Sequence, residues 1–298
     1  MKKYFVFTTI LALSVITINC NKKNDQETIL KGNASVFVDE SLRPIIDEQV
    51  EIFESRYDGK IQLISKSENE IIQGLVKDTT KIAVLTRQLT NEEQKVFASR
   101  KIFPKQTHFA TDAIVLISNK KTKDTLISIE EITAFLNGST STKIKGLVFD
   151  NPNSSSVRYL NDLAGIKAST NKNIYSFKTN EEVIKYVSEN NGMIGVVGLN
   201  WIEQSNAALE NITVLSVKNS KSNSYIYPSQ NNLAEKTYPL ARDLYIINCQ
   251  GYSGLGMGFS SFVAGEVGQR IILKSGLLPF KMPGRNIIVR NKIEKDNK

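Results

Sequence analysis

Cysteine, histidine and tryptophan are scarce in this chain of 298 residues, which contains two, one and one of them. Cys249 lies in the apolar, strand-like run LYIINCQ, so we expect a small buried hydrophobe there. Cys20 closes an apolar run at the N-terminus and is not expected to form a disulfide with Cys249, so stability must come from the core. With His108 alone, no His/Cys cluster has metal-ligand spacing, and we expect neither a metal site nor a cofactor.

The chain also lacks a concentrated stripe of one charge. Its formal net charge is +8, but the lysines are scattered and few aromatic residues stand among them. Nucleic-acid binding usually needs a basic stripe with stacking aromatic side chains, so the sequence argues against a nucleic-acid partner. A mild positive field instead favours an anionic solute or an anionic membrane surface.

One apolar run of signal-peptide length stands at the N-terminus, where Lys2 and Lys3 precede the stretch from Tyr4 to Ile18. This pattern predicts an export signal over residues 1–19 rather than part of the fold. The following Cys20 and its polar flank resemble a bacterial lipoprotein signal, which predicts lipidation of Cys20, a linker over 20–31 and a place in the periplasm or cell envelope. An uncleaved anchor and a soluble secreted form are the alternatives.

The remaining chain alternates between β-rich runs and segments with helical periodicity. Ser41 is expected to cap a helix with Pro44 in its first turn, Thr90 and Glu93 form a capping box, and Gly138 closes another helix. The final glycine-rich segment is expected to form one helix. Strands are expected at 34–38, 60–65, 81–89, 110–120, 143–150 and 193–202. This order predicts an α/β fold with largely parallel sheets and enough length for two lobes.

Three consecutive serines in FDNPNSSSVRYL are the most informative local feature. Ser154, Ser155 and Ser156 stand where a helix should begin, and Arg158 falls in its first turn. Serine is a common helix cap, so a purely structural role is the ordinary interpretation. The same arrangement could bind an anion, because free amides, hydroxyls and a guanidinium would converge at the helix start.

Several segments together resemble the phosphate-type solute-binding proteins of ABC importers. They are ASVFVDESLRPIIDEQVEIFE, IAVLTRQLTNEEQ, TDAIVLISN with ISIEEITAFLNG, the serine stretch, NNGMIGVVGLNWI, and YPLARDLYIINC with FSSFVAGEVGQRIILKSGLLPF. The resemblance implies the two-lobed type II periplasmic-binding fold with hinge crossovers and an interlobe cleft. Lobe 1 would comprise residues 30–112 and 226–298, and lobe 2 residues 113–225. It also implies a small oxyanion, most simply phosphate, as ligand and an ABC permease as partner.

The resemblance implies oxyanion contacts from the serine helix. Ser154, Ser155 and Ser156 stand where the family has Ser-Gly-Thr, and Asp150 stands where its ligand arginine usually precedes that motif. A carboxylate there would repel an anion, so Arg158 is the candidate replacement for the missing charge.

The other lobe would supply contacts from the ends of its strands. Asp39 and Ser41 follow the first strand, where the acid could accept a hydrogen bond from a protonated ligand oxygen. Thr86 and Arg87 match the family's Ser-Arg pair, although an ordinary polar strand end is an equal alternative. Ser67-Glu68-Asn69 replaces a Gly-Ser-Gly region and is more acidic.

Four further residues are expected to support the fold rather than to bind solute. Asp112 should accept hydrogen bonds from hinge amides, and Arg242 should pair with an acid at the hinge. Trp201 and Phe259 should pack lobe against helix.

The predicted function is therefore a lipid-anchored binding protein for a small oxyanion, not an enzyme. The acids at 39, 40, 68 and 150 argue against plain phosphate, and an organic solute or a structural or adhesion lipoprotein without oxyanion binding are the alternatives. A serine hydrolase would need a base, and the sequence around 154–156 contains neither histidine nor a G-x-S-x-G motif.

Overall fold

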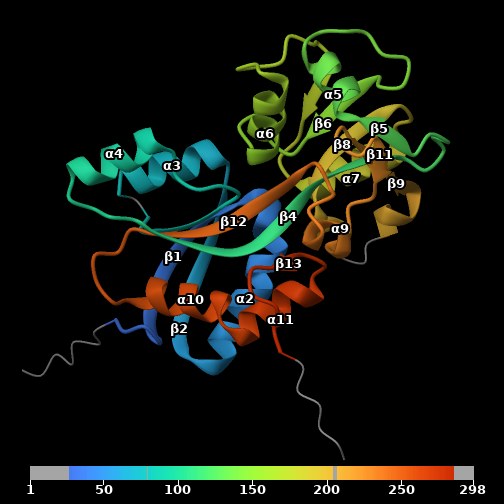
Figure 1. Ribbon diagram of the computed structural model, residues 1–298. Coiled ribbons are helices and arrows are strands. Elements are labelled where there is room, and N and C mark those ends of the chain that lie inside the picture. The colour runs from blue at the N-terminus through green and yellow to red at the C-terminus, as the bar shows by residue number, and fades with distance from the viewer. Residues whose placement is uncertain (1–26, 79, 204–206, 285–298) are drawn as a thin grey trace, which may run out of the picture.

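The computed structural model describes residues 27–78, 80–203 and 207–284 (Figure 1). The predicted signal peptide over 1–19, the lipidation site Cys20 and most of the predicted linker lie outside these residues. Within the described part of the chain, no helix combines the length and apolar character needed to cross a membrane.

The first lobe is built on parallel strands. β1 (Lys31–Asp39) pairs in parallel with β2 (Asp58–Lys66) on one side and with β3 (Ile82–Leu85) on the other. Its helices are α2 (Arg43–Arg56), α3 (Glu68–Val76), α4 (Asn91–Ser99), α10 (Leu255–Ala264) and α11 (Glu266–Lys274), with the short helices η2 (Glu40–Leu42) and α9 (Gln230–Ala234). Because β1, β2 and β3 run the same way, their carboxyl ends meet at one edge of the sheet.

The second lobe repeats this scheme around β8 (Met193–Gly198), β6 (Gly146–Phe149) and β7 (Ile174–Ser176), which are also parallel neighbours. Its helices are α5 (Ile129–Leu136), α6 (Ser155–Ala164), α7 (Asn180–Glu189), α8 (Leu199–Ile202) and η3 (Ala207–Asn211). A small separate sheet contains β11 (Ser224–Ile226), β10 (Ser216–Asn219) and β5 (Leu126–Ser128).

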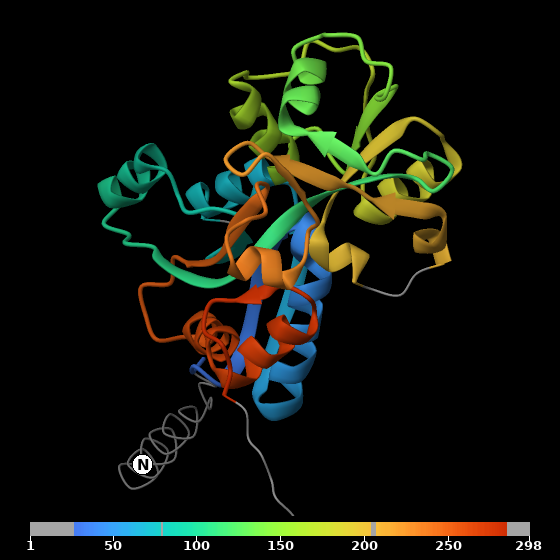
Figure 2. The same cartoon turned by 45° about the vertical axis from the view of Figure 1, so that its right-hand side comes forward.

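One long strand joins the two lobes. β4 (Lys105–Asn119) has 15 residues, and its first part pairs with the antiparallel β12 (Ala241–Asn248) while its last part pairs with β8 and β9 (Ile212–Val214). The short strand β13 (Leu278–Pro279) also pairs with the first part. Figure 2 shows the resulting shape, with the blue and red first lobe below and the green to yellow second lobe above. The predicted α/β architecture of two lobes joined by crossing strands is confirmed.

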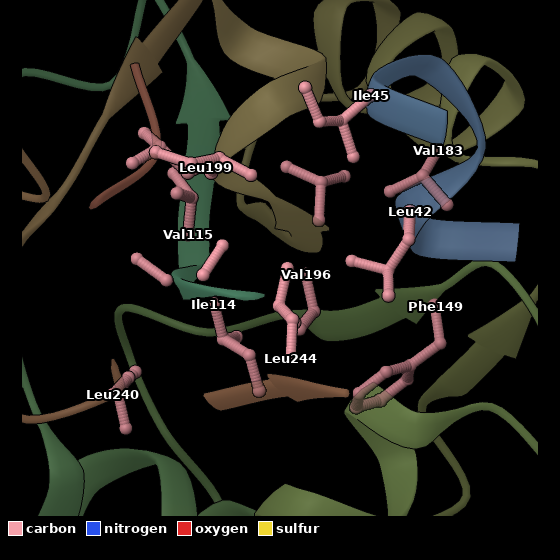
Figure 3. Close-up of a cluster of buried hydrophobic side chains, with 14 of the residues drawn as sticks. Leu42, Ile45, Ile114, Val115, Phe149, Val183, Val196, Leu199, Leu240 and Leu244 are labelled. Atoms are coloured by element: carbon pink, nitrogen blue, oxygen red, sulfur yellow. The ribbon is translucent and has the colours of Figure 1, made fainter. Parts of the chain in front are cut away.

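The hydrophobic core continues across the junction of the lobes (Figure 3). Leu42 and Ile45 of the first lobe belong to the same buried cluster as Phe149 and Val183 of the second, and Ile114 of β4 is also part of it. A second cluster of buried residues lies in the first lobe around Phe97 and includes Cys249. Burial raises the pKa of the Cys249 thiol to about 11, so the predicted role of Cys249 as a small core residue is confirmed.

Helix capping follows the sequence at several places. Thr90 and Glu93 form the expected capping box, and α5 ends just before Gly138, whose φ of 92° favours glycine. The prediction for Ser41 is wrong, because Asp39 caps the turn η2, in which Ser41 lies, and α2 begins only at Arg43.

Two other secondary-structure predictions need correction. The strand expected over 193–202 ends at Gly198, so Trp201 lies in the short helix α8. The final segment forms two helices rather than one, since the backbone of Gly265 is extended (φ −83°, ψ 174°) and separates α10 from α11.

Candidate functional site between the lobes

Polar residues follow the carboxyl ends of strands in both lobes. Asp39 is the last residue of β1, Thr86 follows β3, and Asp150 follows β6. All three are nearly fully buried, with exposures of 1%, 3% and 1%. Buried polar side chains at the ends of parallel strands are typical of ligand sites in α/β proteins.

The first lobe contributes a tight turn. Asp39 Oδ1 accepts hydrogen bonds from the backbone N–H of Ser41 at 3.0 Å and from its hydroxyl at 2.6 Å. Asp39 Oδ2 is buried and has no hydrogen-bond partner among the described residues. The turn therefore fixes the Ser41 hydroxyl and leaves one carboxylate oxygen available.

The second lobe contributes a helix N-terminus. Ser154 caps α6 by accepting a hydrogen bond from the N–H of Val157, and Ser155 and Ser156 are the first two helical residues. The expectation that the three serines open a helix is confirmed. No acidic residue lies in the first turn, so the partial positive charge of the helix start is not neutralised there.

A buried arginine joins these two elements. Arg242 lies on β12 opposite Asp112 of β4, and its Nε and Nη2 donate to Asp112 Oδ2 at 3.0 and 2.8 Å. Its Nη2 also donates to the Ser41 hydroxyl at 3.0 Å, and its Nη1 donates to the Ser155 hydroxyl at 3.0 Å. One guanidinium thus contacts a serine from each lobe.

We call Asp39, Ser41, Ser155, Ser156 and Arg242 the interlobe site. Asp112 orients the arginine and also accepts a hydrogen bond from the N–H of Leu199, so the predicted roles of Asp112 at hinge amides and of Arg242 as partner of an acid are confirmed. The contact of Arg242 with the serines was not predicted. The sequence signals only the pairing of Asp112 in TDAIV with Arg242 in LARDLY, because a charge within an apolar strand run is costly to bury without a partner.

A close approach of backbone completes the junction. A Cβ on Gly198 would lie 3.1 Å from the Ser41 carbonyl oxygen and 2.8 Å from Asn200 Oδ1, so only glycine fits without displacement. The Ser41 carbonyl also accepts a hydrogen bond from the indole N–H of Trp201 at 2.9 Å. Trp201 packs against the core and Phe259 is fully buried in it, which confirms their predicted packing roles.

Two more acids lie beside the interlobe site. The amide Nδ2 of Asn180, at the start of α7, donates to Glu40 Oε2 at 2.5 Å and contacts Asp150 Oδ2 at 3.4 Å. Burial, aided by the charge of Asp150, raises the pKa of Glu40 to about 8. Burial also raises the pKa of Asp39 to about 6, against the opposing charge of Arg242, and raises that of Asp150. These groups therefore hold protons at pH values where ordinary carboxyls are ionised.

These shifts predict a pH dependence of folding stability without ligand. Between pH 4.5 and about 8, folded Glu40 holds a proton that the unfolded chain has lost. Unfolding then releases the proton, so stability should fall as pH rises through this window, by up to about 1.4 kcal/mol per pH unit for each extra proton held. Urea unfolding from pH 5 to 8.5 measures this slope, and the slope should decrease in Glu40→Gln. An unchanged slope in that variant would contradict the assignment.

Arg158 and Arg87 lie apart from the contacts of Arg242. The Nε of Arg158 lies 2.7 Å from Glu68 Oε1, and its Nη1 donates to Asp162. The Nε of Arg87 donates to the same Glu68 oxygen, while its two other nitrogens bind the carboxylate of Glu93. The structure therefore engages both predicted ligand arginines in ion pairs, and that of Arg158 connects the two lobes.

The other predicted contact residues lie near this network. Thr86 Oγ1 is buried without a hydrogen-bond partner in the described chain, as is Glu68 Oε2. A polar pocket of about 270 Å³ opens between Glu68 and Asn69 of the first lobe and second-lobe residues that include Ser154 and Arg158. Across the described ranges, no group of three or more His, Cys, Asp or Glu side chains could hold a metal ion.

Comparison with known proteins agrees with this architecture. The phosphate-binding protein PstS of Borreliella burgdorferi is 26% identical over an alignment of 298 positions. The alignment covers 94% of this chain and 100% of that protein. A putative phosphate ABC transporter substrate-binding protein from Clostridium perfringens, solved with bound phosphate, has a TM-score of 0.70 at 18% identity and covers 84% of this chain and 100% of its own. An ABC-type phosphate transport receptor from Vibrio cholerae has a TM-score of 0.64 at 17% identity, with coverages of 84% and 100%.

At 18% and 17% identity, the similarity to the two solved structures shows that the fold is shared. The family is established by sequence, since the model of the PBP superfamily domain matches residues 24–267, well over half of the chain. The chain belongs to the PBP superfamily.

Proposed function

We propose that this protein captures inorganic phosphate at the interlobe site and delivers it to an ABC permease. The observation that carries the proposal is the Arg242 guanidinium, which contacts a serine hydroxyl from each lobe beside the N-terminus of α6. Amides, hydroxyls and a guanidinium are the donors that replace water around an oxyanion. The phosphate-binding relatives support the same assignment.

Binding would proceed by closure of the lobes around the anion. The hydroxyls of Ser41 and Ser155, which now accept hydrogen bonds from Arg242, would rotate to donate to phosphate when the lobes separate and reclose. Asp39 Oδ2, which lacks a partner in the described structure, would accept a hydrogen bond from a protonated phosphate oxygen. Of the other predicted contacts, Ser154 remains a helix cap and Ser156 lies at 3.5 Å from Arg242.

The roles of Arg158, Arg87 and Thr86 follow from their placement. We infer that Arg158 stabilises the closed form through Glu68 instead of binding phosphate, and that Arg87 orients Glu68 from within the first lobe. Thr86 stays a candidate ligand through its unpartnered hydroxyl. The lobes would span residues 30–112 with 226–298, and 113–225.

Export and anchoring complete the proposal. Residues 1–19 would direct export, and lipidated Cys20 would hold the protein at a membrane in the periplasm or cell envelope. We propose a binding protein rather than an enzyme, because the ring of the sole histidine, His108, contacts the Ala110 carbonyl and stacks on Tyr245 instead of contacting the serines.

Isothermal titration with phosphate tests the proposal. We expect one phosphate bound per chain, and Ser155→Ala should weaken binding by roughly ten- to a hundredfold, because a hydrogen bond to a charged group contributes about 1.5–3 kcal/mol. Ser222→Ala, at an exposed turn, is the matched control and should bind as the wild type does. Absence of heat with phosphate, together with a melting temperature that phosphate leaves unchanged, would favour a structural lipoprotein or an organic solute.

A further inference from the structure

Carboxylates outnumber cations around Arg242. Among the described residues its ion-pair partner is Asp112, yet Asp39, Glu40 and Asp150 also lie nearby, where burial and, to a smaller extent, the charge of Asp150 raise the pKa values of Asp39 and Glu40. A fully ionised anion added to this group would meet repulsion from the buried Asp39 and Asp150 and the half-buried Glu40. An anion can therefore bind beside these acids only if it carries protons that hydrogen-bond to them.

Two buried carboxylate oxygens are free to accept hydrogen bonds from such protons. Asp150 Oδ1 and Asp39 Oδ2 have no hydrogen-bond partner within the described chain, and both side chains are 1% exposed. Buried polar atoms are almost always hydrogen-bonded, and an unpaired one costs about 1–3 kcal/mol. Both oxygens are acceptors when ionised, so they require donors. Sulfate carries only acceptors near neutral pH, whereas a protonated phosphate carries P–OH donors.

The donors around Asp150 leave its Oδ1 without a hydrogen bond from any described residue. Its Oδ2 faces the amide of Asn180, and the hydroxyl of Ser154 and the backbone N–H groups of Asp150 and Asn151 also act on its carboxylate. The charged and titratable groups that act on this acid and its neighbours come from six elements: Asp39 from β1, Glu40 from η2, Asp112 from β4, Arg242 from β12, Tyr159 and Arg158 from α6, and Glu68 from α3.

We propose that Asp150 is a specificity-determining residue that, together with Asp39, restricts the interlobe site to the doubly protonated phosphate monoanion. One P–OH would donate to Asp39 Oδ2 and the other to Asp150 Oδ1. Binding from a solution of the dianion then takes up one proton, since HPO₄²⁻ and H⁺ give bound H₂PO₄⁻. The inference rests on the proposed function and explains how a site rich in acids accepts an anion.

Titration calorimetry at pH 6, 7, 8 and 8.5, in pairs of buffers with different ionisation enthalpies, counts the protons. The wild type should take up about one proton per phosphate at pH 8, and its affinity should fall by up to about tenfold per pH unit above neutrality. Sulfate should give no binding.

Asp150→Asn supplies the variant for the same experiment, because its amide can donate to an ionised oxygen. It should lose the proton uptake and gain affinity for sulfate by about tenfold or more. Asp162→Asn, an exposed acid on the same helix, should behave as the wild type. A melting curve verifies that each variant is folded.

The possible failures are distinguishable. Phosphate binding that is independent of pH, or proton uptake that persists in Asp150→Asn, would overturn this inference and leave phosphate binding standing. A wild type that binds no phosphate at any of the four pH values would overturn both.

Discussion

Arg242→Gln is expected to lower the affinity for phosphate by about a hundredfold or more. Among the residues that the structure describes, this guanidinium is the one cation that contacts serines of both lobes, and each charge-assisted hydrogen bond lost contributes about 1.5–3 kcal/mol. Titration calorimetry measures the loss. Arg158→Gln is the comparison variant and should lower the affinity by no more than a few-fold, because it removes the ion pair with Glu68 that favours closure but no contact with the anion. Strong binding by Arg242→Gln with loss in Arg158→Gln would return the ligand role to Arg158.

Folding must be separated from binding in this test. Arg242→Gln leaves Asp112 buried at 0% exposure without its ion-pair partner, which is expected to cost about 3–5 kcal/mol of stability. The double variant Asp112→Asn with Arg242→Gln removes the unpaired charge and should recover much of that loss. Its affinity for phosphate should stay about a hundredfold or more below that of the wild type. A double variant that binds normally would show that the arginine acts only through the fold.

Phe53→Ala is expected to lower the free energy of unfolding by about 3–5 kcal/mol. The ring is fully buried where α2 meets α10, with its centroid 5.6 Å from that of Phe259 and 5.4 Å from that of Phe262. Its removal leaves a cavity lined by aromatic rings that cannot collapse fully. Urea unfolding measures the change at constant pH.

Phe103→Ala is the matched control for the core variant, since Phe103 is 82% exposed. We expect a change within about 0.5 kcal/mol there. Equal effects of the two substitutions would contradict the packing described for the first lobe.

The sequence predicted most of the fold because its local signals agree with the tertiary structure. Alternating strands and helices, the capping box at Thr90 and the serine cap at Ser154 depend on neighbouring residues alone. The turn at Ser41 was predicted incorrectly because Asp39, an equally good cap, lies two residues earlier. Its carboxylate accepts a hydrogen bond from the Ser41 N–H, so the turn begins before Ser41. The break at Gly265 was missed because glycine also occurs within α10.

The site was predicted only in part because it depends on contacts between distant residues. Ser41, Ser155 and Asp39 follow strand ends or open helices, so local patterns find them. Arg242 lies 87 positions from Ser155 and 201 from Ser41, and only the pairing of β12 with β4 places it between them. Arg158 was favoured because it is near the serines in sequence, but its side chain extends to Glu68.

A crystal structure of the protein grown with phosphate tests the central claim most directly. Our account predicts one tetrahedral anion enclosed by both lobes, within hydrogen-bond distance of Ser41, Ser155 and Arg242. An anion bound elsewhere, with these three side chains keeping their present hydrogen bonds at saturating phosphate, would contradict it.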